Sequence, residues 1–562
     1  MAVTTNRPAE AHQSFESLPR RQLIGTLAGL MLALFLASLD QTIVGTALPR
    51  IIADLHGFEH YTWVATAYLV ASTATAPIVG KLTDLHGRKP YFLGGIVLFL
   101  AGSALCGLSQ DMTQLSLLRG VQGIGAGVIM ANAFTVIGDI FPPAERGKYQ
   151  GILASVFGLS SVIGPAVGGY LTDSLSWRWV FYVNLPLGAI ALAVLIAEFP
   201  DIRPHRGHRG IDYLGASTLV ASVVPLLLAL SWGGTTYSWD SPIIIGLFLF
   251  AFAMAVAFVL IERSAPEPIL PLDLFRIRAV TIALLAASLT SVAMFGALLF
   301  IPLFIQAVTG SSATSSGTML TPMMVVMVLA STTAGQITAR TGRYKPVFLV
   351  GLALVTVGTF LLSQLTAESP YSTVLLNLVV VGLGLGLVMP IFTLVVQNAV
   401  PYSRLGVATS VTQFFRSIGG TLGAAVFGSV MTNRFAAALA VNLSPEVRAA
   451  IPPDQLAAFQ NPQALLNPDV DARLRALFAP FGERGPDLLA AFTLAIRQSL
   501  ASALHGVFLA GAAIVAIAFV AAWFLPEIPL RKRNRAPQDV SPDGAVAARS
   551  TTPSELVQPR AE

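Results

Sequence analysis

The chain has 562 residues, of which 54% are hydrophobic and only 11% are charged, and its formal net charge is +5. A soluble domain carries about 25% charged residues, so this chain is too poor in charge to cover several globular surfaces. The composition therefore excludes a soluble enzyme, a disordered protein and a nucleic-acid binder. It predicts an all-α polytopic membrane protein, in which the excess of basic residues reflects membrane topology.

Neither a metal site nor a cofactor is expected. The single cysteine, Cys106, excludes an intramolecular disulfide and a cysteine-based metal cluster. None of the seven histidines stands at metal-ligand spacing from another on one predicted helix.

Fourteen apolar runs are long enough to cross a bilayer, which takes about 20 mostly apolar residues. The first run follows a polar segment and is too long for the core of a signal peptide, so we predict an uncleaved first transmembrane helix. An even number of spans places both termini on one side. The runs are 23–44, 60–80, 91–109, 114–137, 151–171, 179–199, 213–231, 243–261, 281–305, 318–338, 346–365, 372–395, 406–431 and 500–525.

The basic residues indicate the orientation. With the N-terminus inside, 24 of the 34 lysines and arginines fall on inside segments and 8 fall outside, six of these in the long loop 432–499. The other two, Arg119 and Arg416, lie within helices. This is the positive-inside bias, and it predicts a multi-pass protein of a bacterial cell membrane with both termini cytoplasmic.

An internal repeat divides the chain. Gly80–Lys89 follows the second run, and a similar segment, Gly335–Arg343, follows the tenth at an offset of 335 − 80 = 255 residues. Two six-helix halves with two inserted helices are therefore expected, as in secondary transporters with a site between repeats. The predicted parts are a cytoplasmic segment 1–22, a first half 23–199, an inserted pair 200–280, a second half 281–525 and a disordered cytoplasmic tail 526–562.

The second half contains the outer loop 432–499, where short amphipathic pieces between prolines predict short helices. A tolerated insertion explains this loop better than a lid over the outer mouth.

Ionisable residues inside a membrane are costly and point to function. Asp40 lies late in the first run and Arg119 about two turns into the fourth, so both are expected at similar depth. A pair between them would keep Asp40 ionised, and a proton or a cationic substrate that breaks the pair would couple transport. A static ion pair is the alternative. Arg416 is expected near the inner face, where snorkelling to the interface explains it best.

Glycine-rich segments predict the positions that gate access. The short loop Gly80–Lys89 can clasp the inner surface in one access state and release it in the other; the alternative is a plain topology anchor. Gly164–Gly169 gives the fifth helix a bend and a closely packed face. The predicted gating residues are Gly80, Asp84, Gly87, Arg88, Lys89, Gly164, Pro165, Gly168 and Gly169.

These motifs together resemble the major facilitator superfamily, and more narrowly its fourteen-helix drug:proton antiporter branch of the EmrB/QacA type. Leu39–Pro49 resembles the helix-1 motif, with Gly45 where the branch commonly has asparagine. Gly80–Lys89 resembles the loop signature, and Arg119–Gly127 the helix-4 motif, whose arginine is implicated in proton transfer. The segments Gly164–Gly169, Trp177–Gly188 and Ile211–Gly215 are also typical of the branch. The resemblance covers about 20–530 and implies the major facilitator fold.

The resemblance implies a proton-coupled exporter of hydrophobic, drug-like compounds that works by alternating access, with Asp40 and Arg119 in proton coupling. Some members that export divalent organic cations carry acidic residues in helix 13, whereas 406–431 has none here. One-proton exchange and monocationic or neutral substrates are therefore expected. An exporter dedicated to one natural product (a lipid, a siderophore or an antibiotic) is the alternative, and a sensor or channel is a remote one.

Polar and aromatic side chains expected to face the pore are scattered over both halves, as a midplane site requires. Each alone is better explained by an interhelical hydrogen bond or a packing contact. The expected partners are a small hydrophobic substrate, protons and the lipid bilayer, with no nucleic acid and a functional monomer; no enzyme activity is expected. The candidate substrate-binding residues are Trp63, Tyr68, Asn132, Gln306, Gln397 and Gln413.

Overall fold

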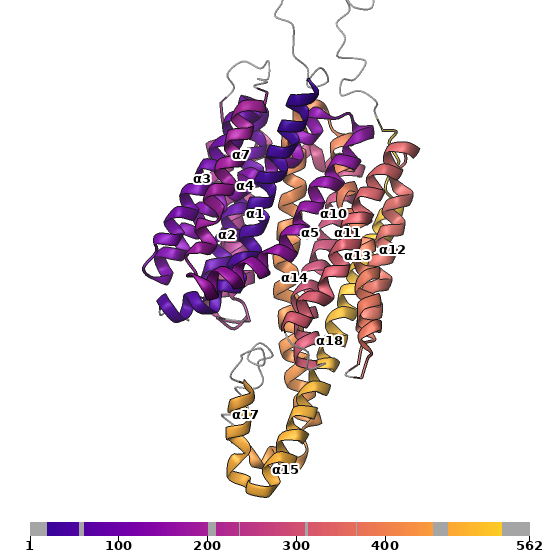
Figure 1. Ribbon diagram of the computed structural model, residues 1–562. Helices are drawn as coiled ribbons and strands as arrows, with labels where there is room; N and C mark the ends of the chain where they lie inside the picture. Colours follow the sequence, from indigo (N-terminus) through magenta and orange to yellow (C-terminus); the bar gives the residue numbers. More distant parts are fainter. Residues whose placement is uncertain are drawn as a thin grey trace, which may run out of the picture.

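The fold is a bundle of long helices lying side by side (Figure 1). A computed structural model of the chain describes residues 19–55, 61–200, 210–234, 236–308, 313–366, 368–452 and 470–530. Within these ranges, fourteen helical segments are long and apolar enough to cross a membrane, and no strand is present. The predicted fourteen-helix membrane protein is therefore confirmed. The predicted segment 1–22 lies almost wholly outside the described residues.

The helices of the N-terminal part are α1 (Arg20–Leu55), α2 (Tyr61–His86), α3 (Arg88–Leu108), α4 (Met112–Ile140), α5 (Pro143–Ser174), α6 (Trp179–Tyr182) and α7 (Asn184–Glu198). Together α6 and α7 form one membrane span. The next two spans are α8 (Tyr213–Trp232) and α9 (Pro242–Ser264).

The C-terminal part contains η3 (Leu272–Arg276), α10 (Arg278–Leu303), η4 (Phe304–Val308), α11 (Ala313–Thr341), α12 (Lys345–Ser363), α13 (Tyr371–Ala399), η5 (Tyr402–Arg404), α14 (Leu405–Asn442), α15 (Pro445–Ala450), α17 (Val470–Phe478), η7 (Ala479–Arg484) and α18 (Gly485–Trp523).

Two of these helices extend well beyond the bundle. α14 and α18 have 38 and 39 residues, longer than the predicted runs 406–431 and 500–525, because helix continues where the sequence turns polar. They project from one end of the bundle, where α15 and α17 lie (Figure 1). We call this end the extension face, and the end where α1 begins and α18 ends the terminus face. Residues 453–469 of the predicted loop lie outside the described part.

The chain stays ordered beyond the predicted end of the second half at residue 525. The Tyr344 hydroxyl donates to Pro526 O (2.7 Å) and accepts from Ile528 N (2.8 Å). Burial raises the pKa of the Tyr344 phenol above its usual value. The buried tyrosine thus holds residues 526–528 against the bundle; residues 531–562 of the predicted tail lie outside the described part.

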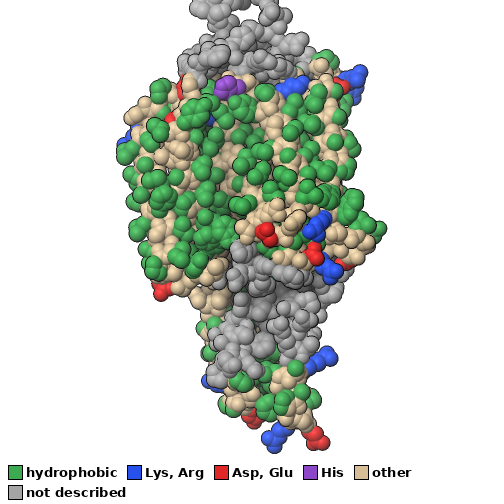
Figure 2. Space-filling model, turned by 90° about the vertical axis from the view of Figure 1, so that its left-hand side faces the viewer, with side chains coloured by type: hydrophobic (Ala, Val, Ile, Leu, Met, Phe, Trp, Pro, Cys, Tyr) green, Lys and Arg blue, Asp and Glu red, His purple; other side chains and the backbone are tan. Residues whose placement is uncertain are grey.

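The outer surface of the bundle suits a lipid environment. Many large apolar side chains are exposed there, including Leu117 at 70% and Phe252 at 70% of their surface. Figure 2 shows hydrophobic side chains covering the face formed mainly by the N-terminal part, with charged groups toward its edges and on the projecting extension. A water-exposed surface of this kind would aggregate, so the pattern favours a bilayer around the bundle.

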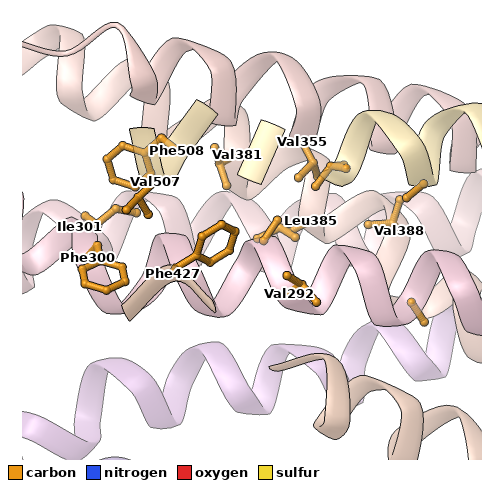
Figure 3. Packing of buried hydrophobic residues seen from close by; sticks show 14 of the residues in the cluster. Val292, Phe300, Ile301, Val355, Val381, Leu385, Val388, Phe427, Val507 and Phe508 are labelled. Atoms are coloured by element: carbon orange, nitrogen blue, oxygen red, sulfur yellow. The ribbon is translucent and has the colours of Figure 1, made fainter. Parts of the chain in front are cut away.

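The C-terminal helices share one apolar core. Figure 3 shows side chains from several helices meeting in it, among them Val292, Phe300, Ile301, Val355, Val381, Leu385, Val388, Phe427, Val507 and Phe508. The Phe427 ring of α14 is 1% exposed and fills the space left by the missing side chain of Gly296 on α10. Because lipid is as apolar as these side chains, close packing rather than exclusion of water holds such helices together.

The internal repeat reappears as a glycine of positive φ at the end of a helix in both halves. Gly87 and Gly342, 255 residues apart, have φ angles of 96° and 69°, a region that favours glycine. Their amides donate to Thr83 O (3.1 Å) and Thr338 O (2.9 Å), again 255 residues apart. Each glycine therefore ends one helix; α3 begins directly after Gly87, whereas two residues separate Gly342 from α12.

The inserted helices lie against the place where the two repeats meet. α8 packs on α9 and contacts both α2 and α14. Near the extension face, the rings of Trp63 on α2 and Trp232 on α8 lie 4.7 Å apart, and the Trp239 indole donates to Ser429 Oγ of α14 at 2.8 Å. The inserted helices α8 and α9 therefore cover the place where α2 and α14 meet.

We expect Phe427→Ala to lower the stability of the protein in detergent by on the order of 2 kcal/mol, because a cavity replaces the ring. Thermal unfolding, followed by tryptophan fluorescence, measures the effect. Phe360→Ala is the matched control, since Phe360 is 47% exposed on α12 and should shift the midpoint little. Equal shifts for the two variants would contradict the packing argument.

Candidate functional site

Asp40 of α1 is fully buried and accepts three hydrogen bonds. Its Oδ2 accepts from Arg119 NH1 at 2.5 Å, and its Oδ1 accepts from Gln122 Nε2 at 2.8 Å and from Asn184 Nδ2 at 2.9 Å. The carboxylate is thus shared by α1, α4 and the start of α7. The structure brings together the two residues that the sequence assigned to proton coupling.

Arg119 of α4 has other partners besides this carboxylate. It donates to Gln122 Oε1 (2.8 Å) on its own helix and to Val64 O (3.2 Å) on α2. The Tyr68 ring lies 4.1 Å from its guanidinium carbon, a cation–π contact. Gly123 allows this arrangement, because a side chain there would collide with the Tyr68 backbone. We call Asp40, Arg119, Gln122, Asn184 and Tyr68 the Asp40 cluster.

Asn184 and Gln122 were missed as candidate residues. Asn184 donates also to Ser103 Oγ (3.0 Å), and Ser103 donates to Phe181 O (2.9 Å), so α3 supports the cluster. Asn184 stands at the first residue of α7, directly after the short α6. Its place in the motif Trp177–Gly188 could have indicated a role for Asn184. Its side chain is an uncharged amide, however, which gave no reason to choose it over the other residues of the motif.

A second polar contact fixes α6 beside α1. The Trp177 indole and the Arg178 guanidinium donate to Asp54 Oδ2 at 2.8 and 3.2 Å. These hydrogen bonds lower the pKa of the Asp54 carboxyl below its usual value. Asp54 lies beyond the membrane span of α1, so this contact orients the segment that leads into Asn184.

A charged network joins the two repeats at the terminus face. Asp84, near the end of α2, accepts from the backbone N–H groups of Gly406 (3.0 Å) and Val407 (2.9 Å) in the first turn of α14. Arg88 donates to Asp84 (2.5 Å) and to Asp139 of α4 (2.9 Å). Because free N–H groups at a helix start favour a carboxylate, Asp84 is well placed there. We call these five residues the terminus-face gate.

An amide network strengthens the same closure. Gln397 of α13 accepts from Gln150 of α5 (3.0 Å) and donates to Phe134 O of α4 (3.2 Å) and Thr409 Oγ1 of α14 (2.8 Å). Gly80 lies directly against Ser410 and Gly406, and Gly147 against Gly335. Lys81 of α2 also pairs with Glu267 (2.7 Å). The described hydrogen bonds between the two repeats lie toward the terminus face.

The other predicted gating residues lie within the N-terminal part. Gly164 and Gly168 of α5 lie against the Thr42 and Thr46 hydroxyls of α1, so both close approaches serve packing. Pro165 lies between them inside α5, and Gly169 has open space around it. Lys89 donates to Phe199 O (2.6 Å), after α7.

The six predicted substrate-binding residues do not form one group. Tyr68 is buried in the Asp40 cluster, Gln397 in the contact between the repeats, and Trp63 against α8. Asn132 is 1% exposed and donates to Val128 O on its own helix (3.0 Å). Gln413 accepts from Arg416 at 2.8 Å. The side chain of Gln306 lies outside the described part. Three of the six are therefore buried contacts within the protein.

The fold and the sequence agree on the family. The family model described as Major Facilitator Superfamily matches residues 30–424. The chain belongs to the major facilitator superfamily. Two solved members of similar fold are the human organic anion transporter MFSD10 (TM-score 0.56, 15% identity, covering 90% of this chain and 100% of that one) and the proton:xylose symporter XylE (0.54, 13%, 90% and 96%). At these identities they support the fold alone.

Relatives within the superfamily are more similar in sequence. The multidrug transporter protein MdtP of Bacillus subtilis (strain 168) is 41% identical over 93% of this chain and 97% of its own length. Multidrug resistance protein 3 of the same organism is 42% identical over 72% and 79%, and the efflux pump dotC of Dothistroma septosporum is 34% identical over 72% and 70%. The chain is a membrane transporter of small molecules rather than a catalytic enzyme.

We expect Asp84→Ala to loosen the terminus-face gate. Losing the acceptor for the first turn of α14 should cost the closed state about 1.4 kcal/mol, a tenfold change in population. Alkylation of a cysteine at Ser410, which is fully buried against α2, should accelerate about as much in a Cys106→Ser background.

Asp273→Ala is the matched control, because Asp273 pairs with Arg404 in a solvent-exposed position near the same face. Such a pair contributes little, so this variant should leave the labelling rate nearly unchanged. If Asp84→Ala also leaves it unchanged, Asp84 does not hold the gate closed.

Proposed function

We propose that this protein is a proton-coupled exporter of hydrophobic small molecules. The observation that carries the proposal is the buried Asp40 cluster, a carboxylate inside the membrane with an arginine as its ionic partner. Intramembrane acidic residues with such partners commonly form proton relays. The names of the relatives, a multidrug transporter and a multidrug resistance protein, support drug-like compounds as substrates.

The cluster suggests how one proton changes the relative free energy of two conformations. A proton on Asp40 removes the negative charge that faces Arg119 at 2.5 Å. Arg119 stays charged, and an unpaired cation in a low-dielectric site costs several kcal/mol. The protonated protein therefore favours a conformation in which Arg119 finds water or another partner, and this difference drives the switch.

The two repeats supply the bodies that move. We take 23–199 and 281–525 as the two halves that rock against each other, with the pair in 200–280 covering one seam. The gate of Asp84 and Arg88 closes the terminus face in the present conformation. The positive-inside bias assigns that face to the cytoplasm, so this conformation is the one that releases substrate and takes up protons from outside.

The test uses purified protein in liposomes with an imposed pH gradient and the voltage held at zero by valinomycin and equal potassium. Two permanently charged dyes, ethidium and pyrene-1-sulfonate, report transport of a cation and an anion. We expect gradient-driven movement of at least one dye. Asp40→Asn should slow it by on the order of 100-fold, the scale of losing an acid–base group.

Asp173→Asn is the matched control, because Asp173 is an exposed carboxylate near the end of α5. This variant should transport like the native protein. Movement of the dyes that survives in Asp40→Asn, with its dependence on the gradient intact, would rule out Asp40 as the coupling carboxylate.

A further inference from the structure

A second membrane-embedded arginine has no role in the mechanism above. Arg416 lies 11 residues after the first residue of α14, roughly 16 Å along the helix and within the candidate membrane span Tyr402–Asn442. Its snorkelling to the inner face stays a prediction.

Arg416 lies on a side of α14 that packs against α10. Gly420, one turn further on the same side of α14, lies against the Phe295 ring of α10, and Gly419 lies against the Ser288 backbone. The side chain of Arg416 stays partly exposed in this position.

The hydrogen bonding of Arg416 is incomplete. Its NH1 donates to Gln413 Oε1 at 2.8 Å, and its buried Nε has no partner among the described residues. Gln413 is on the same helix, so this bond does not tie α14 to a neighbour. Arg119, by contrast, has partners on α1, α2 and α4. Arg416 thus lacks the cross-helix contacts that a packing role would require.

The charge of Arg416 is also not balanced. The described residues of α10, α11, α12, α13 and α14 include no aspartate or glutamate, and α18 has only Asp487 in its first turn on the extension. Both oxygens of Asp40 are already occupied. An unpaired charge at this depth is expensive, so an anion from outside the chain would offset a large cost.

We propose that Arg416, with Gln413 beside it, binds the anionic group of an amphiphilic substrate. The guanidinium presents its free donors as a fork, which matches two oxygens of a carboxylate, sulfonate or phosphate. The phenylalanines Phe414 and Phe415, with Phe275 against the latter, supply apolar surface nearby. This inference rests on the proposed exporter function, and it replaces the expectation of monocationic or neutral substrates.

The test measures equilibrium binding to the full chain in phosphatidylcholine nanodiscs, without a pH gradient. Three ligands share one ring system: pyrene-1-sulfonate, pyrene-1-methanol and 1-pyrenemethylammonium. The native protein should prefer the sulfonate. Arg416→Gln should weaken sulfonate binding by about 10- to 100-fold, the value of a charge-assisted hydrogen bond, and should leave the alcohol nearly unchanged and the ammonium equal or tighter. Arg416→Lys should retain part of the preference.

Arg434→Gln is the matched control, since Arg434 is exposed on the same helix beyond the membrane. It should bind all three ligands as the native protein does. Equal losses for the sulfonate and the alcohol in Arg416→Gln would overturn the proposal in favour of a packing role. A native protein without preference for the sulfonate would overturn it as well.

Two further measurements are needed. One distinguishes a lipid head group from a free solute as the source of the anion, and the other distinguishes failure of this inference from failure of the proposed exporter mechanism. If phosphatidylglycerol in the nanodisc competes with the sulfonate only when Arg416 is present, the anion site stands and a lipid head group is its natural occupant. Without competition, the site takes free anionic solutes. Proton-driven ethidium transport without anion preference contradicts this inference alone, whereas anion preference without proton-driven transport contradicts the exporter mechanism alone.

Discussion

The ion pair between Asp40 and Arg119 is the contact around which the N-terminal half is arranged. Neither group can be buried alone at membrane depth, so each added neighbour supplies a missing hydrogen bond: Gln122 and Asn184 for the carboxylate, and the Tyr68 ring for the guanidinium. Glycines of α4 lack side chains where α2 and α3 pack against it, so these helices come close enough to provide the partners. The hydrogen bonds and ring contact of this one ion pair therefore determine how α1, α2, α4 and α7 approach one another.

The terminus-face gate depends on similar physics with a different acceptor. Asp84 satisfies backbone N–H groups of a helix in the other half, so the closed state gains a hydrogen-bonded helix start that the separated state lacks. The Asp40 cluster lies nearer the other end of the bundle and shares no residue with the gate. Two helices contribute to both: α4 carries Arg119 and Asp139, and α2 carries Tyr68 and Asp84.

Hydrophobic run length predicted the fourteen spans because a bilayer imposes a minimum length on every one of them. Depth along the helices likewise predicted that Asp40 and Arg119 meet. The same reasoning failed for the ends of α14 and α18, where helix continues into polar sequence. Tyr68, Asn132 and Gln397 showed why pore-lining residues are hard to predict: an uncharged polar side chain can equally satisfy a neighbour within the bundle.

The repeated turns at Gly87 and Gly342 have a consequence for the symmetry of the cycle. Both halves retain the same backbone joint, but the position that corresponds to Asp84 holds Ala339, which carries no charge. The two halves are therefore not equivalent at these turns. Asp84 binds the first turn of α14 in the other half, whereas the uncharged Ala339 cannot make such a contact, so the contact at the terminus face has no counterpart made by the same position of the second half.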